Sequence, residues 1–199
     1  MTDQDARAQI LTTAMSLFAQ KGFANTSMND IVRESGLSKG GVYWHFKSKD
    51  DLIAAIFDTF FGGQEHILAS VLSSEANAAE KLNQLALLAS ADLEAVFAEF
   101  PASLEFHNLA VHSEPLRARL RQFYDAYHQQ ICALLQEGID EGIWAADTAV
   151  SPTAYTLIAA FEGVILLWSL FPDTTDLSEQ LITAVTLLLR GLENREIGE

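Results

Sequence analysis

The chain has 199 residues, of which 12 are Lys or Arg and 27 are Asp or Glu, so its net charge at neutral pH is −15. That charge argues against a protein that coats nucleic acid with its whole surface. The single cysteine, Cys132, excludes a disulfide framework and favours a reducing compartment. No apolar stretch reads as a membrane span, and the first residues form no hydrophobic signal region. We therefore expect a cytoplasmic protein of one or two domains that does not contact a membrane.

The charges are distributed unevenly along the chain. Residues 1–50 hold six basic and five acidic side chains, whereas the remainder carries a net charge of −16. This pattern fits an acidic, solvated surface with an unremarkable first quarter. It equally fits a small DNA-facing end on a body that repels DNA.

The first quarter of the chain predicts three short helices. The first carries apolar residues at helical spacing and ends after Lys21, where Gly22 supplies a common C-terminal signal. Ser27 is a natural N-cap for the second helix, which Gly36 ends, and Ser38 caps the third. Two short helices joined by a three-residue turn that contains glycine predict a helix-turn-helix.

The third helix has two different faces when its residues are placed 100° apart. Val42 and Phe46 point to the core, whereas Trp44 and Gly40 lie on the outward face. A helix of this kind suits the DNA major groove, because glycines let the backbone approach and an apolar ring can meet a thymine methyl group. The alternative is that the aromatic side chains of this helix pack against neighbouring helices.

Helical spacing of apolar residues continues through the rest of the chain, without a convincing alternating strand pattern. A fourth helix is expected from near Ser48, and breaks at proline or glycine separate the later ones. The later helices are expected at residues 76–99, 101–112, 115–141, 152–171 and 176–195. The predicted fold class is all-α, with about nine helices. They form a three-helix helix-turn-helix head over residues 1–48 and a larger bundle over residues 49–199.

Four motifs stand in residues 7–53: F-x-x-K-G-F, T-S-M-x-D-I, G-L-S-K-G and V-Y-W-H-F-K-S-K-D-x-L. Together they resemble the N-terminal domain of the TetR family of bacterial transcriptional regulators, and the C-terminal part weakly resembles betaine-responsive and multidrug-type members. The resemblance implies contacts with double-stranded DNA from ten residues: Thr26, Ser27, Ser38, Lys39, Gly40, Gly41, Tyr43, Trp44, His45 and Lys49.

The resemblance also assigns roles within this set. Thr26, Ser27 and Lys49 would contact phosphate, and the third helix would enter the groove. Gly41 stands where members of the family often have Thr, Ser or Ala. We therefore expect base preference to depend more on Lys39, Trp44 and DNA shape.

One such head makes few contacts, so selective binding to a palindromic operator calls for a homodimer. The last two expected helices carry apolar residues at helical spacing, and the helix at 152–171 is apolar on most faces. We expect the dimer interface at Leu157, Phe161, Ile165, Trp168, Leu181, Val185 and Leu188. The alternative is that these stripes only fill the core of the protomer.

Large aromatic side chains are concentrated in the middle of the chain. Aromatic walls with a few polar groups are typical of a pocket for a mostly apolar molecule, although ordinary core aromatics give the same pattern. We expect the small-molecule effector to contact Phe97, Phe100, Phe106, His107, Tyr124 and Tyr127. Glu162 lies within the apolar run AAFEGVILL, where it faces a cationic ligand or a partner, or reaches solvent at an interface rim.

These expectations indicate a ligand-responsive transcriptional regulator, a repressor that the effector releases from its operator. Two other classes stay open: a small-molecule-binding helical protein without DNA binding, and a helical-bundle enzyme. A di-iron enzyme needs two acid-x-x-His pairs, and Asp125-x-x-His128 is the one pair in the chain. No phosphate loop, nucleophile elbow or zinc-ligand spacing occurs. We therefore predict no catalytic residues, no metal and no cofactor.

Overall fold

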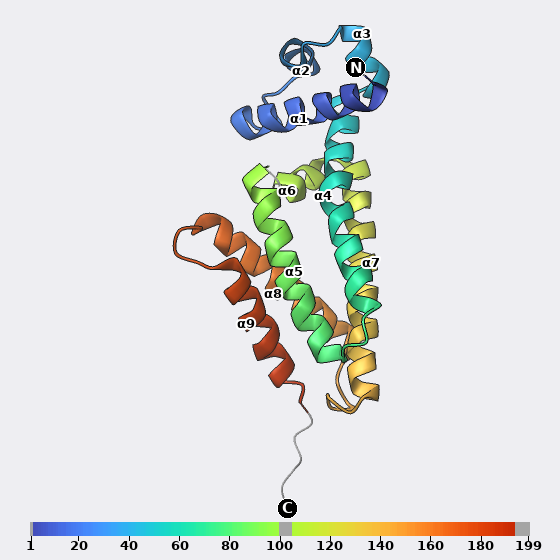
Figure 1. Cartoon of the computed structure of the whole chain (residues 1–199), viewed down its shortest axis with the longest axis vertical. Helices are drawn as coiled ribbons and strands as arrows, with labels where there is room; N and C mark the ends of the chain where they lie inside the picture. Colours follow the sequence, from blue (N-terminus) through green and yellow to red (C-terminus); the bar gives the residue numbers. More distant parts are fainter. Residues whose placement is uncertain (1, 100–104, 194–199) are drawn as a thin grey trace, which may run out of the picture. The chain divides into compact units, whose positions relative to one another are not determined.

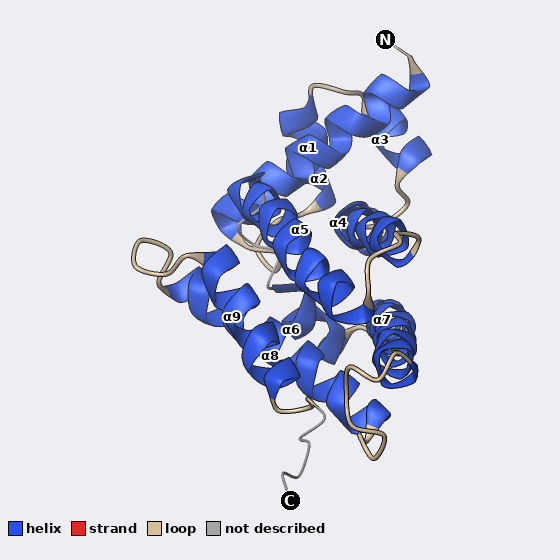
Figure 2. Cartoon of the chain, turned by 60° about the horizontal axis from the view of Figure 1, so that its bottom comes forward, coloured by secondary structure: helices blue, strands red, loops and turns tan. Residues whose placement is uncertain are grey.

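The computed structural model describes residues 2–99 and 105–193, without the side chains of residues 63–66, 92 and 96–99. Within this part of the chain every regular element is a helix (Figure 1, Figure 2). The helices are α1 (Asp3–Lys21), α2 (Met28–Ser35), α3 (Lys39–His45), α4 (Lys49–Leu72), α5 (Ala78–Glu99), α6 (Glu105–His112), α7 (Glu114–Asp140), α8 (Val150–Leu170) and α9 (Leu177–Arg190). The predicted all-α fold with about nine helices is confirmed.

Most predicted helix boundaries agree with the structure within a few residues, and the last helix differs most. Helix α9 ends at Arg190, not at residue 195. Gly191 follows, and the N–H of Ala145 then donates to the carbonyl oxygen of Leu192 at 2.9 Å. This long-range pairing replaces a further helical turn.

Helix α8 corrects one expectation from the sequence. By length and composition it is apolar enough to cross a membrane, so the expectation that no stretch reads as a span was wrong. A single such helix is weak evidence for a membrane protein, because helices of water-soluble proteins pass the same test.

Contacts divide the chain into two compact units. The head unit comprises residues 1–63 and 95–117, and the bundle unit comprises residues 64–94 and 118–199. Helices α4, α5 and α7 each run from one unit into the other. The head unit thus contains α6 as well as the helix-turn-helix, and the functional division after residue 48 stays a prediction.

The short helices of the head unit begin and end on local caps. The Ser27 hydroxyl accepts a hydrogen bond from the N–H of Asp30, whose carboxylate accepts from the N–H of Ser27, so α2 starts with a capping box. Gly36 ends α2 in the left-handed conformation, at φ 67°, which is costly for residues with a Cβ. The Ser38 hydroxyl accepts from the N–H of Gly41 at 3.1 Å and starts α3. Neighbouring residues therefore specify the turn between α2 and α3.

Apolar side chains from α1 to α4 and from α6 form the core of the head unit. Its most completely buried members are Ile10, Phe18, Phe23, Ile31, Val42, Leu52, Ile56 and Phe106. The Phe106 ring lies between 5.6 and 6.3 Å, centroid to centroid, from the rings of Phe23, Phe57 and Phe60. Helix α6 therefore shares a core with the helix-turn-helix.

The bundle unit has its own core, to which the end of α4 and helices α5, α7, α8 and α9 contribute. Helices α8 and α9 lie side by side (Figure 1). After α7, the buried indole of Trp144 packs directly on Gly138, where a Cβ atom would lie only 2.1 Å from the ring. Lys81 of α5 is buried and pairs with Glu137 of α7 at 2.7 Å. Contacts between residues far apart in the sequence therefore join these helices.

Candidate DNA-binding surface and effector cavity

Helix α3 presents an indole to the outside of the head unit. Val42 and Phe46 are buried, as the helical spacing predicted, and they anchor α3 against the core. Trp44 is 72% exposed. The outward orientation expected for Trp44 is therefore confirmed, and the alternative that it packs within the head is excluded.

The other predicted residues of the α2–α3 turn and α3 lie around Trp44 in the sequence and differ in exposure. Ser38, Lys39 and Gly40 are exposed, and Gly41 and Tyr43 are half-buried. The Lys39 ammonium lies 5.8 Å from the centroid of the Tyr43 ring, which is a cation–π distance.

The two glycines of α3 differ in the space around them. A Cβ added at Gly40 would meet nothing within 4 Å, whereas one at Gly41 would lie 3.3 Å from the hydroxyl oxygen of Ser38. Gly40 thus leaves an open approach to the helix backbone. Gly41 leaves room for the Ser38 cap.

Lys47 is a residue that sequence reasoning did not include in the site. Its ammonium donates to the carbonyl oxygens of Tyr43 at 2.8 Å and Trp44 at 3.3 Å, and it lies 5.7 Å from the Trp44 ring centroid. A cation at a helix C-terminus is favourable for the helix dipole. Its place directly after the last turn of α3 is the signal that could have identified it.

Thr26 and Ser27, expected to contact phosphate together, are placed differently. Thr26 is 1% exposed, and its hydroxyl donates to the carbonyl oxygens of Gly22 at 3.0 Å and Leu17 at 3.3 Å. This burial corrects the expectation for the Thr26 side chain, which closes the loop after α1. Ser27 is exposed at the start of α2, where helix N–H groups favour an anion.

Lys49 is also bonded inside the head unit. Its ammonium donates to the carbonyl oxygens of Phe23 at 2.8 Å and Thr26 at 3.2 Å. These bonds link the first residue of α4 to the loop between α1 and α2. The phosphate contact expected of Lys49 stays a prediction, for which an ammonium group has a third N–H.

His45 faces the start of α1. Its side chain is largely buried, and its Nε2 lies 3.5 Å from Oδ1 of Asp3. The ring also packs near Phe46, with centroids 6.4 Å apart. The packing alternative therefore describes His45 better than a base contact does.

The charged groups of α2 form a small exposed network. Hydrogen bonds from the hydroxyl and N–H of Ser27, together with Arg33, hold the pKa of the Asp30 carboxyl well below its usual range. Asp30 is therefore ionised at neutral pH. Its charge lies in the first turn of α2, where it favours the helix.

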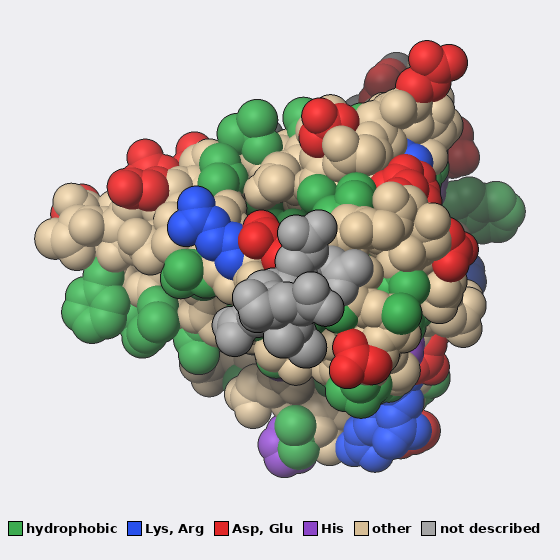
Figure 3. Space-filling view, turned by 90° about the horizontal axis from the view of Figure 1, so that it is seen from below, with side chains coloured by type: hydrophobic (Ala, Val, Ile, Leu, Met, Phe, Trp, Pro, Cys, Tyr) green, Lys and Arg blue, Asp and Glu red, His purple; other side chains and the backbone are tan. Residues whose placement is uncertain are grey.

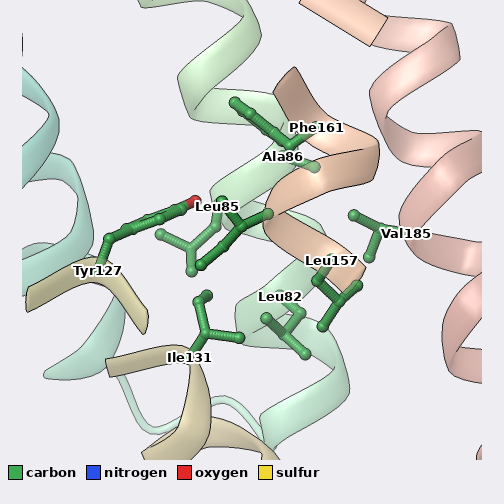
Figure 4. Close-up of a pocket in the computed structure, with 9 residues that line it drawn as sticks. Leu82, Leu85, Ala86, Tyr127, Ile131, Leu157, Phe161 and Val185 are labelled. Carbon is green, nitrogen blue, oxygen red and sulfur yellow. The ribbon is translucent and has the colours of Figure 1, made fainter. Parts of the chain in front are cut away.

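The bundle unit contains a cavity of about 20 Å³ between α5, α7, α8 and α9 (Figure 4). Its lining is apolar apart from one hydroxyl and consists of Leu82, Leu85, Ala86, Tyr127, Ile131, Leu157, Ile158, Phe161 and Val185. The Tyr127 side chain extends from α7 into the middle of this group (Figure 4). A cavity of this size has room for about one water molecule.

The described residues among those expected to bind the effector are divided between the two units. Phe97 and Phe100 lie outside the described side chains. Phe106 is buried in the head unit and His107 is exposed there. Tyr127 lines the bundle cavity.

Phe106 and Tyr127 therefore belong to different cores, which aromatic content in the sequence does not reveal. The α5 stripe of Leu82, Leu85 and Ala86 was the missed signal, because these residues share one helix face.

Glu162 lies beside the two tyrosines of α7. Burial and the Glu162 carboxylate, to which the Tyr124 hydroxyl donates a hydrogen bond, raise the pKa of Tyr124 far above its ordinary value. Burial and the same negative charge raise the pKa of Tyr127 to about 12. Glu162 itself is half-buried. Its charge acts on both Tyr124 and Tyr127.

The seven residues expected at a dimer interface face the interior more than the outside. Three are buried within the protomer: Leu157, Ile165 and Leu181. Four are half-buried: Phe161, Trp168, Val185 and Leu188. The large apolar residues exposed on α8, after it and on α9 are Tyr155, Leu166, Leu167, Leu170, Phe171 and Leu187. The predicted stripe therefore helps to fill the core of the protomer, and a different stripe faces outward.

Among the described residues, no group of three or more His, Cys, Asp or Glu side chains is arranged to hold a metal ion. Cys132 is half-buried, with its Sγ 3.5 Å from Nε2 of His128. Burial raises the pKa of the Cys132 thiol, which makes it less reactive.

The exposed α3 on a helix-turn-helix defines a DNA-binding regulator, and comparison with known proteins gives its family. The profile of the bacterial regulatory proteins of the tetR family matches residues 10–56. The profile of the C-terminal domain of BetI-type transcriptional repressors matches residues 78–192. The chain belongs to the TetR family of bacterial transcriptional regulators, as its N-terminal motifs predicted, and is not an enzyme.

Several relatives cover most of the chain. YfiR of Bacillus subtilis, an uncharacterized HTH-type transcriptional regulator, is 32% identical over 166 residues, which cover 80% of this chain and 78% of YfiR. The HTH-type transcriptional regulator TtgR of Pseudomonas putida is 26% identical over 178 residues, covering 87% of this chain and 85% of TtgR.

Solved structures show the same fold. The SmeT–triclosan complex has a TM-score of 0.81 at 19% identity and covers 98% of this chain and 95% of SmeT. SmeT is the repressor of a Stenotrophomonas maltophilia multidrug efflux pump. A putative transcriptional regulator from Pseudomonas aeruginosa PAO1 has a TM-score of 0.83 at 21% identity, with coverages of 96% and 91%.

Proposed function

We propose that this chain is a cytoplasmic, ligand-responsive repressor. It binds a palindromic operator as a homodimer and leaves it when a mostly apolar small molecule enters the bundle unit. The observation that carries the proposal is the exposed Trp44 on α3 of a helix-turn-helix that the family profile covers. Repressors occur among the relatives, for example KstR2 of Rhodococcus jostii.

In this proposal α3 enters the major groove. Trp44 supplies an apolar face for a thymine methyl or a sugar, and Lys39 and Tyr43 supply donors. Lys47 holds the last turn of α3 through the carbonyls of Tyr43 and Trp44, so the indole is presented on a rigid helix end. Ser27 marks the start of α2, a second site for a phosphate.

The exposed apolar stripe of α8 supports the homodimer. Tyr155, Leu166 and Leu170 are separated by 11 and 4 residues, so they lie on one helix face. Leu170 is 64% exposed, and Leu187 on the adjacent α9 is 63% exposed. Contiguous apolar surface of this kind is unfavourable in water and typical of protein–protein interfaces. A two-fold contact along α8 and α9 would cover it on both protomers.

The cavity in the bundle unit supports an effector site there, provided that the cavity can expand. A drug-sized ligand needs roughly 300–1,000 Å³, whereas the cavity measures about 20 Å³. Binding therefore requires side chains such as Tyr127 and Phe161 to move apart. That requirement links ligand binding to the shape of the bundle, because α7 and α8 carry these two residues.

Release from DNA needs a ligand that prefers one arrangement of the bundle over another. A coupling free energy of roughly 1–3 kcal/mol would change operator occupancy about 5- to 150-fold. Helices α4 and α7 are continuous between the two units, so either can transmit the change to the head.

Fluorescence anisotropy tests the proposal, with a labelled duplex from the region upstream of the protein's own gene and a random duplex. We expect the upstream duplex to bind more tightly and Trp44→Ala to lose about tenfold or more of that preference. Val111→Ala, which shortens another exposed apolar side chain of the head unit, should bind like the wild type. Equal binding of both duplexes by the wild type at low salt contradicts operator recognition.

A further inference from the structure

We infer that Lys47 determines specificity as a positioning residue: it fixes the orientation of the Trp44 indole and does not itself bind phosphate. The inference rests on the proposed recognition of an operator by α3 and deepens it. It assigns part of the choice between DNA sequences to a side chain that acts on the indole instead of on the DNA.

The Trp44 side chain projects from a helix end that is otherwise held in place. Trp44 is 72% exposed, whereas the neighbouring Phe46 is buried. From α1, Oδ1 of Asp3 lies 3.5 Å from Nε2 of His45, and the Arg7 guanidinium lies 5.3 Å from the centroid of the Phe46 ring. The backbone at the end of α3 is thus fixed from the side of α1. What remains to be fixed is the orientation of the indole.

Lys47 is bonded to both of the helices that flank it. Its backbone N–H donates to Oδ2 of Asp51, in the first turn of α4, at 2.9 Å. Its ammonium reaches back to α3 and donates to the carbonyl oxygens of Tyr43 at 2.8 Å and Trp44 at 3.3 Å. Although Lys47 is exposed, its backbone and the end of its side chain are therefore both held.

From this position the Lys47 ammonium also lies over the indole. It is 5.7 Å from the centroid of the Trp44 ring, which is a cation–π distance. One cation thus bonds to the carbonyl of Trp44 and attracts the ring of the same residue. A side chain that is ordered before binding loses less freedom when it meets DNA, so its contact is stronger.

The same bonds distinguish Lys47 from a lysine that binds phosphate. The two carbonyl oxygens use two of the three N–H groups of its ammonium. Lys47 follows the C-terminus of α3, where the helix dipole retains a cation, whereas Lys39 is exposed at the N-terminus, where the dipole favours phosphate. The two lysines next to the aromatic rings of α3 therefore have different roles.

The charge of the rest of the chain makes this orientation important. Residues 64–94 and 118–199 of the bundle unit contain 17 acidic and five basic side chains, a net charge of −12. Acidic side chains are spread over the face seen in Figure 3, whereas Lys and Arg form a few isolated spots. Such a field repels DNA. The head unit therefore has to supply the affinity from a small number of well-oriented contacts.

Fluorescence anisotropy of the full-length protein over a series of salt concentrations tests the inference, with the upstream and random duplexes described above. Lys47→Met keeps the aliphatic part of the side chain and removes the ammonium. We expect its preference for the upstream duplex to fall about 2- to 12-fold, the range that ordering one side chain spans, with the salt dependence of the wild type. Lys47→Gln, which also lacks the cation, should show the same loss.

Lys39→Met is the matched control, because it removes the same charge from the other end of α3. It should reduce the slope of log affinity against log salt concentration by about one, as the loss of one phosphate contact does. Lys47→Arg keeps a cation over the ring and should retain the preference of the wild type.

A double variant shows whether Lys47 acts through the indole. In a Trp44→Ala background, Lys47→Met should change the preference by less than about twofold, because the group that it positions is absent. A loss as large as in the wild-type background would mean that Lys47 supports α3 as a whole or contacts DNA directly. That result would overturn the inference.

Other outcomes separate this inference from the proposed function. If the wild type prefers the upstream duplex and Lys47→Met keeps that preference, the positioning role is overturned while operator recognition stands. The same holds if Lys47→Met weakens both duplexes alike and reduces the salt slope by about one, as a phosphate contact would. If the wild type binds both duplexes equally, operator recognition fails, and the role of Lys47 in specificity fails with it.

Discussion

The head unit and the bundle unit use their polar side chains differently. In the head unit, Ser27, Thr26 and Lys49 bond to backbone groups and close helix ends and loops. In the bundle unit, Lys81 of α5 bonds instead to the side chain of Glu137, 56 residues away on α7. The head unit uses these side chains to close helix ends and to tie a loop to α4, and the bundle unit uses Lys81 to pair two long helices.

Helix length explains the difference. Helices α2 and α3 have 8 and 7 residues, which is too short for stable helices without caps and tertiary contacts. Helices α7 and α8 have 27 and 21 residues, so their ends matter less than the choice of neighbours. The short helices of the head therefore need caps and loop bonds in order to fold, whereas the long helices of the bundle need specific contacts with one another to adopt one arrangement.

The largest expected effect disrupts the packing of Trp144 on Gly138 at the end of α7. In Gly138→Ala the new methyl group would lie between 2.1 and 2.8 Å from three atoms of the Trp144 ring. A buried indole that is forced to move costs roughly 1–3 kcal/mol or more. Urea unfolding followed by circular dichroism would measure the loss in free energy of unfolding.

Gly62→Ala is the matched control, because a Cβ at this position of α4 meets nothing within 4 Å. Alanine is a better helix former than glycine by up to about 1 kcal/mol, so this variant should be as stable as the wild type or more stable. Equal unfolding midpoints for Gly138→Ala and the wild type would show that Trp144 does not require glycine at position 138.

An intermediate loss of stability is expected when Lys49 of the head unit is replaced. Lys49→Met keeps the aliphatic part of the side chain and removes the two hydrogen bonds to the carbonyl oxygens of Phe23 and Thr26. We expect a loss of about 1–2 kcal/mol in the free energy of unfolding. Affinity for all DNA sequences should fall alike, because the loop between α1 and α2 loses its link to α4.

Lys39→Met tests whether a lysine can contribute to DNA binding through its charge without contributing to stability. Lys39 is exposed at the start of α3, so its removal should weaken DNA binding and leave the free energy of unfolding within about 0.5 kcal/mol of wild type. The distinction fails if the two lysine variants destabilise the protein equally.

The last effect is absent at neutral pH and appears only at high pH, in the bundle. Burial and the charge of Glu162 raise the pKa of Tyr127 to about 12, whereas an unfolded tyrosine ionises near pH 10. The unfolded chain therefore loses this proton first, so the stability contributed by neutral Tyr127 is present below about pH 10 and is lost as the pH rises towards 12.

Urea unfolding between pH 9 and 12 would follow this loss. Tyr127→Phe should show a shallower decline than the wild type. Glu162→Gln should also reduce the decline, because it removes one cause of the raised pKa. A decline of the same steepness in all three proteins would contradict the position of Tyr127 beside Glu162.

The three helices of the helix-turn-helix and the turns between them could be predicted from the sequence, because their signals are local. Ser27 and Gly36 lie in the turns that they specify, and the opposite orientations of Val42 and Trp44 follow from helical spacing alone. The hydrogen bonds of Lys49 could not be predicted from local patterns. Their acceptors, the carbonyl oxygens of Phe23 and Thr26, lie 26 and 23 positions earlier in the chain.

In the bundle, the sequence determined that helices form and that each carries apolar stripes. The tertiary structure decided which stripe faces inward: Leu157 and Leu181 are buried, whereas Leu170 is exposed. It also decided that Phe106 belongs to the head core and that Tyr124 bonds to Glu162. Helical periodicity places a residue around its own axis. Which neighbour covers that residue depends on packing between segments that the sequence keeps far apart.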